Sequence, residues 1–144
     1  MTVPREFIHA SRDFGAVLID VRDRAMVSTT HRAFTTLEAV LRVFRRRLTA
    51  DQSLEFAGLL NVGLRALFVA GWNANCPVVP FAPKQKMQEE FMSFRRDHNL
   101  SPDTAIRDVT EALRLHIDEE KLKRFLKSVS PEALSFWGFS PEVE

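Results

Sequence analysis

Apolar residues recur at steps of three and four along most of the chain, a spacing that lines one face of a helix. The first of these segments is predicted to be a helix from about Pro4 to Met26. Gly15 lies off its apolar face, so we expect this helix to kink or break there. The second segment is the more regular of the two. The first stripe runs from about Pro4 to Met26 through Phe7, Ala10, Phe14, Val17, Leu18, Val21 and Ala25, and the second contains Ala33, Leu37, Val40, Leu41, Phe44 and Leu48.

Capping residues predict where the other helices begin. The hydroxyls of "STTH" at 28–31 precede the second stripe, and Thr49 with Gln52 has capping-box form. An almost wholly apolar helix at 64–70 is expected to end at Gly71. Further start signals are Ser101-Pro102, Asp118 and Ser130-Pro131. The pattern predicts an all-α fold of about eight helices.

The same order of helices and caps occurs twice. "RALFVAGW" at 65–72 corresponds to "EALSFWGF" at 132–139, and between the two units Pro77, Pro80 and Pro83 predict an extended connector. We expect one compact domain, because a unit of about 55 residues buries too little surface alone. The predicted parts are repeat one at 5–72, connector at 73–86, repeat two at 87–139 and a tail at 140–144.

A family resemblance rests on three short motifs. They are "LRALFVAGW", the "CP" shortly after it, and "QEEF" at the start of the second unit. Over about residues 14 to 139 the chain resembles the bacterial family catalogued as domain of unknown function 2267, whose members carry this helical unit in tandem. The resemblance implies an all-helical fold and no established activity.

The composition of the chain excludes several classes of function for this protein. The 144 residues carry 20 basic and 19 acidic side chains, so a net charge of +1 gives no global attraction to nucleic acid or membranes. The single Cys76 excludes an internal disulfide and fits a reducing compartment. No stretch reaches the roughly 18 unbroken apolar residues of a spanning helix, and the N-terminus is charged. We expect a cytoplasmic protein.

Catalytic and metal chemistry find little support. The four histidines are not spaced as metal ligands usually are, and no residue that could act as a general base lies near Cys76 in the sequence. The five glycines are scattered and form no glycine-rich phosphate-binding loop. Paired carboxylates at Asp20/Asp23 and Glu89/Glu90 are expected to be solvated, and those at 118–120 to favour a helix N-terminus. We therefore predict no catalytic residues, no cofactor and no metal.

Two groups of residues remain as candidate binding surfaces. Arg42, Arg45 and Arg46 are predicted to point outward together from the second stripe. They either form a solvated face that favours the helix dipole or bind phosphate or an acidic partner. No aromatic residue that could stack with bases lies beside them in the sequence.

The second candidate is an apolar groove between the repeats, rimmed by Trp72, Phe81 and Trp137. The plainer interpretation is that these side chains seal the core.

The favoured function is a non-catalytic module, monomeric or dimeric, that binds a protein partner. The alternatives are nucleic-acid or acidic-partner binding through the Arg42–Arg47 face and binding of a small apolar ligand in the groove.

Overall fold

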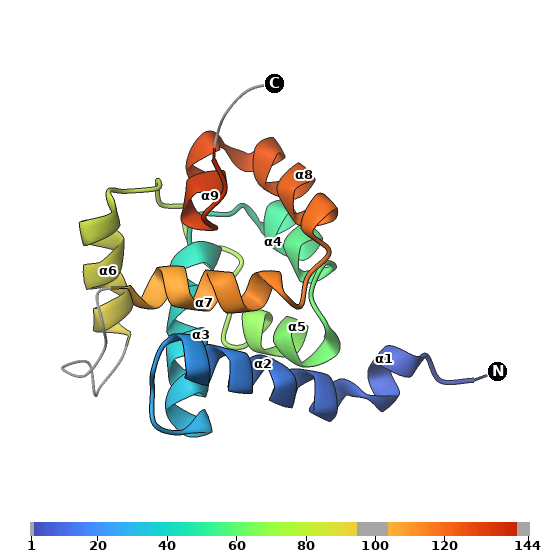
Figure 1. Ribbon diagram of the computed structural model, residues 1–144. Helices are drawn as coiled ribbons and strands as arrows, with labels where there is room; N and C mark the ends of the chain where they lie inside the picture. The colour runs from blue at the N-terminus through green and yellow to red at the C-terminus, as the bar shows by residue number, and fades with distance from the viewer. Residues whose placement is uncertain (1, 95–103, 141–144) are drawn as a thin grey trace.

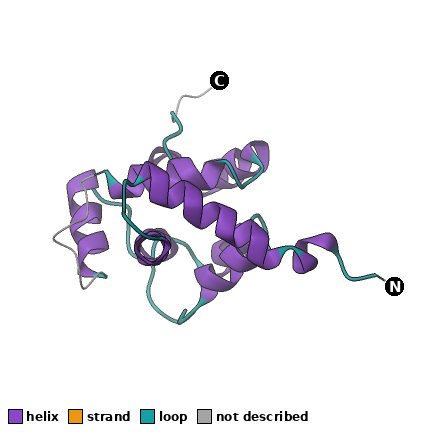
Figure 2. Cartoon of the chain, turned by 60° about the horizontal axis from the view of Figure 1, so that its bottom comes forward, coloured by secondary structure: helices purple, strands orange, loops and turns teal. Residues whose placement is uncertain are grey.

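The computed structural model describes residues 2–94 and 104–140 of the chain. In these ranges it is all-helical, as predicted, with nine helices and no strand (Figure 2). The helices are α1 (Arg5–Ile8), α2 (Ala10–Arg24), α3 (Thr30–Arg45), α4 (Ala50–Ala57), α5 (Val62–Val69), α6 (Lys84–Ser93), α7 (Ala105–Arg114), α8 (Glu119–Val129) and α9 (Pro131–Phe136).

The first apolar stripe forms two helices, and the break is at His9 rather than at Gly15. Gly15 lies within α2, where no atom of another element comes within 4 Å of the place its Cβ would take. α1 buries none of its residues and projects away from the other helices in both views (Figures 1 and 2). The apolar stripe therefore continues beyond the part of it that the core buries.

Side-chain caps begin α3, α4, α8 and α9, as the sequence predicts. Thr29 accepts a hydrogen bond from the backbone of α3, and Thr49 and Gln52 form a complete capping box at α4. Asp118 and Ser130 cap α8 and α9, with Pro131 at the first position of α9. The cap expected at Ser101-Pro102 lies outside the described residues.

α3 lies at the centre of the molecule and packs against α2, α5, α6 and α7, and α7 passes across it (Figure 1). Eight of its sixteen residues are buried. Because its stripe is broad, neighbours can cover it from several directions. α3 is thus the element against which the others are positioned.

Aromatic rings fill the interior between the first and second halves of the chain. Phe44 of α3 lies 5.2 Å from Phe136 and 5.5 Å from Trp137, measured between ring centroids. Phe56 of α4 lies 5.6 Å from both Phe125 and Trp137. Rings at these distances bury large apolar areas and favour specific relative orientations. One core therefore contains rings from both halves.

The connector runs without helix from Gly71 to Pro83, and α6 begins at Lys84, three residues before the predicted start of the second repeat at residue 87. Gly71 and Gly138 both have positive φ, 66° and 82°, just beyond α5 and α9. Within the described ranges, no helix combines the length and the apolar character needed to span a membrane. The division into two repeats stays a prediction.

Candidate functional site

The fold brings Trp72 beside the three arginines of the predicted basic face. Arg42, Arg45 and Arg46 at the end of α3 line a cavity of about 600 Å³ together with Trp72. Its other walls come from the first turn of α4, the connector and Phe94 at the end of α6. We call this the arginine cavity. One residue of the predicted groove, Trp72, thus lies in the same site as the three arginines.

Trp137 and Phe81 lie elsewhere. The Trp137 side chain is in the core with 1% of its surface exposed, and its indole nitrogen has no hydrogen-bond partner among the described residues. Phe81 lines a different cavity of about 500 Å³, with Met87, Ile106 and Phe136 among its walls. We call this the Phe81 cavity. The predicted groove rimmed jointly by Trp72, Phe81 and Trp137 is therefore not formed, because Trp72 and Phe81 line different cavities and Trp137 is buried in the core.

The three arginines differ in how their charges are compensated. Arg46 lies 2.7 Å from a carboxylate oxygen of Glu90, whereas Arg42 comes no closer than 4.0 Å to Glu38. Arg45 donates two hydrogen bonds to backbone carbonyls, to Phe68 at 2.8 Å and to Ala70 at 3.1 Å. Arg45 is partly exposed, as Arg42 is, but these two hydrogen bonds direct its side chain towards the end of α5, so the expectation that all three point outward together does not hold for Arg45. Its side chain turns back because α5 ends there with free carbonyl groups.

The guanidinium of Arg45 is partly buried and lies near the positive charge of Arg42. Burial lowers the pKa of its guanidinium below the ordinary value, and the nearby charge of Arg42 lowers it further. An arginine nevertheless stays charged in a protein. Among the described residues that line the cavity, none is an aspartate or a glutamate. An anion from outside would therefore find three guanidinium groups in the wall, of which Arg46 is already paired with Glu90.

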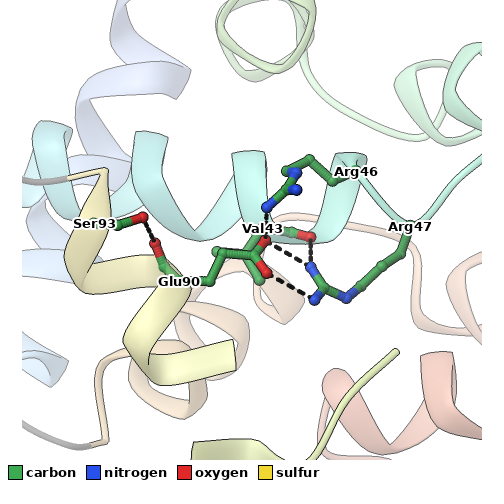
Figure 3. A network of polar contacts seen from close by, with 5 residues as sticks. All are labelled: Val43, Arg46, Arg47, Glu90 and Ser93. Atoms are coloured by element: carbon green, nitrogen blue, oxygen red, sulfur yellow. Dashed lines mark hydrogen bonds and ion pairs between the residues drawn. The ribbon is translucent and has the colours of Figure 1, made fainter. Parts of the chain in front are cut away.

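A buried ion pair fixes one side of this site. Arg47 is 5% exposed and donates two parallel hydrogen bonds to the Glu90 carboxylate, at 2.8 and 2.9 Å, and a third to the carbonyl of Val43 (Figure 3). Arg46 contacts the same carboxylate, and Ser93 donates to the Glu90 carbonyl (Figure 3). The expectation that Glu90 is solvated is wrong, since its side chain is 15% exposed.

Aromatic side chains also surround the arginines, which the sequence neighbourhood does not suggest. The guanidinium carbons of Arg42 and Arg46 each lie 6.0 Å from the centre of the Phe94 ring. Cations at this distance from a ring face are attracted by its quadrupole. Phe94 and Trp72 come from segments far along the chain, so only the folded structure reveals this wall.

Catalytic and metal chemistry gain no geometric support in the described part of the chain. No group of three histidine, cysteine or acidic side chains there is arranged to hold a metal ion. His116 instead lies 2.6 Å from Asp20, and Cys76 is an exposed free thiol. His98 lies outside the described residues.

Comparison with known proteins identifies the family but no activity. None of the curated proteins matches the chain. A family model does match, over residues 14–135, and its description is an uncharacterized conserved protein, domain of unknown function 2267. On this match, which covers most of the all-helical structure, the chain belongs to the domain of unknown function 2267 family.

Proposed function

We propose that this protein is a non-catalytic cytoplasmic module that binds an acidic segment of a protein partner in the arginine cavity. The supporting observation is the charge of the cavity, since Arg42, Arg45 and Arg46 line it and no carboxylate does among its described residues. Arginine is the residue best suited to bind carboxylates, because its planar fork donates two parallel hydrogen bonds. The exposed thiol of Cys76 fits the reducing cytoplasm.

A protein partner is favoured over nucleic acid by how local the charge is. The net charge of +1 gives no extended basic surface for a phosphate backbone. The aromatic wall of Trp72 and Phe94 is compatible with stacked bases as well, so nucleic acid is an outcome that the experiment distinguishes.

The test is the binding of a fluorescein-labelled hexaglutamate peptide, followed by anisotropy at about 50 mM salt, where charges are weakly screened. We expect the double variant Arg42→Gln/Arg46→Gln to weaken binding at least about 10-fold, since each charge-assisted hydrogen bond contributes about 1.5–3 kcal/mol. The matched control is Arg124→Gln/Lys127→Gln, which removes two exposed charges from α8.

Two results would contradict the proposal. One is equal loss of binding in the cavity variant and the α8 control, which would reduce the effect to net charge. The other is tighter binding of single-stranded oligothymidine than of hexaglutamate, with a steep salt dependence, which would favour nucleic acid.

A second candidate function is suggested by the Phe81 cavity. Its walls include Phe81, Met87, Ile106 and Phe136, and its volume of about 500 Å³ is in the range of small-molecule sites. We propose as this alternative that it binds a small apolar ligand. Fluorescence of the probe anilinonaphthalene sulfonate should rise on binding and should fall in Ile106→Phe, which fills the cavity; an unchanged signal would exclude it.

A further inference from the structure

We propose that the group bound in the arginine cavity is a side-chain carboxylate, and that it sits between Arg45 and Ala50, the first residue of α4. This inference rests on the proposed function, since it names the anionic group and its place within the same cavity. It comes from comparing Arg45 with Arg114, an arginine of the second half of the chain.

The two arginines hold equivalent positions relative to the helices around them. Arg45 lies four residues before Thr49, the N-cap of α4, and Arg114 lies four residues before Asp118, the N-cap of α8. Each donates a hydrogen bond to a backbone carbonyl 23 residues further along the chain, at the end of α5 or in α9's C-cap. The acceptors are Phe68 for Arg45, at 2.8 Å, and Trp137 for Arg114, at 3.4 Å.

The two sites differ in one acidic side chain. Glu119, the first residue of α8, places a carboxylate oxygen 3.0 Å from Nη2 of Arg114. The first residue of α4 is Ala50, which lines the arginine cavity and has only a methyl group. In the described part of the chain, Arg45 donates its hydrogen bonds to backbone carbonyl groups and to no side-chain carboxylate. A carboxylate supplied from outside would complete at Arg45 what Glu119 completes at Arg114.

An aromatic ring contacts Arg114, and an aromatic residue also lines the cavity that contains Arg45. The guanidinium of Arg114 lies 3.8 Å from the ring centre of Phe139, which directly follows the left-handed Gly138. In the first half, the left-handed Gly71 is followed by Trp72, which lines the arginine cavity. The arginine cavity thus contains Arg45 and Trp72 in its wall but no carboxylate among its described lining residues.

The surroundings favour the carboxylate of a peptide side chain. Glu119 is 52% exposed while it contacts Arg114, so this geometry can be reached by a carboxylate that approaches from solvent. Arg42 and Arg46 line the same cavity and offer contacts to further acidic residues of one segment. The first turn of α4 adds the positive end of a helix dipole. An acidic peptide would satisfy all of these groups together.

The experiment is to build the missing carboxylate into the chain. Ala50→Glu should occupy the place beside Arg45 and weaken hexaglutamate binding at least about 10-fold, the expected effect of losing a charge-assisted hydrogen bond. Its thermal midpoint should not fall, because an acidic residue favours the first turn of a helix. The matched control is Ser11→Glu, an exposed position in the first turn of α2 with the same change in charge, which should alter binding less than about 2-fold.

Arg45 itself provides a second readout. In the NMR spectrum, the side-chain Nε–Hε signal of Arg45 should shift when hexaglutamate is added and should already be shifted in Ala50→Glu without peptide. Inorganic phosphate should compete with hexaglutamate only weakly. Displacement of the peptide by phosphate at lower concentration than by glutarate would overturn the inference and identify a phosphate site.

The remaining outcomes separate this inference from the proposed function. If Ala50→Glu binds hexaglutamate as the parent does while Arg42→Gln/Arg46→Gln does not, the cavity binds acidic partners but the place beside Arg45 is not used. Equal weakening by Ala50→Glu and Ser11→Glu would also overturn the inference. If neither the arginine variant nor Ala50→Glu changes binding, the proposed function fails as well.

Discussion

Glu90 compensates two arginines of the α3 terminus with one carboxylate. Arg47 is buried against it with a bidentate pair of hydrogen bonds, and the Nε of Arg47 has no partner in the described part of the chain. A buried guanidinium that loses its carboxylate remains desolvated and uncompensated, which costs more than the pair itself contributes. The contact also joins two helices, because Glu90 belongs to α6 and Arg47 lies just after the end of α3.

We therefore predict that Glu90→Gln lowers the free energy of unfolding by about 3 kcal/mol, the usual scale for breaking a buried ion pair. The neighbouring Glu89 is exposed on the same helix, so Glu89→Gln is the matched control and should change it by less than about 0.5 kcal/mol. Urea denaturation followed by circular dichroism measures both. Similar values for the two variants would mean that the Arg47 pair is not coupled to folding.

We also expect the contribution of the Glu90 carboxylate to folding stability to depend on pH. Burial by itself would raise the pKa of Glu90, but hydrogen bonds and charge from Arg47 and Arg46 outweigh it and hold the pKa below its ordinary value of 4.5. A lowered folded-state pKa contributes stability above the unfolded pKa, and this is lost as pH falls through the folded value. The stability difference between the parent and Glu90→Gln should be constant above pH 4.5 and shrink below it. A difference that grows on acidification would contradict this sign.

At the scale of the helix, substitution of two glycines by alanine should change the free energy of unfolding in opposite directions. Gly15 in α2 has open space around the Cβ position, whereas a Cβ at Gly63 in α5 would lie 2.7 Å from the Cβ of Phe14. We predict that Gly15→Ala raises the free energy of unfolding by about 0.5–1 kcal/mol through helix propensity. Gly63→Ala should lower it by about 1–3 kcal/mol, because α2 and α5 must separate. Chemical denaturation of both variants measures these changes, and a stabilising Gly63→Ala would disprove the close approach.

The starts of several helices could be predicted from the sequence because caps are local. Thr49, Asp118 and Ser130 each accept a hydrogen bond from a backbone N–H three residues ahead, so the signal lies within one turn. The break at His9 has no such signal, since its neighbours on both sides have apolar spacing. Gly15 suggested a break that does not occur, because an intact backbone and open space tolerate glycine at a modest cost.

The candidate site was predicted only in part, and the reason is sequence separation. The three arginines could be grouped because one helix carries Arg42 and Arg45 and Arg46 directly follows it. Their wall partners Trp72 and Phe94 come from other segments, and the Arg47–Glu90 bond joins residues 43 positions apart. Such contacts depend on how the helices pack, which periodicity does not specify.

At the scale of the whole molecule, the two halves of the chain share one hydrophobic core. Phe44 and Phe56 from the first half contact Phe136, Phe125 and Trp137 from the second, with centroid distances of 5.2–5.6 Å. Separation would expose these rings to water, at about 25 cal/mol for each Å² of apolar surface. Conformational entropy opposes folding in each half, so we expect neither half to be stable without the shared surface.

We predict that the fragments 1–79 and 80–144 are each largely unfolded alone and fold when mixed. Each should lack a cooperative thermal transition, and an equimolar mixture should regain helical circular dichroism and such a transition, because Phe44 and Phe56 then meet Phe136 and Trp137. Substituting Trp137→Ala in the second fragment should prevent this recovery, since it removes the ring that contacts both phenylalanines. A cooperative transition in the first fragment alone would instead show that it has a sufficient core of its own.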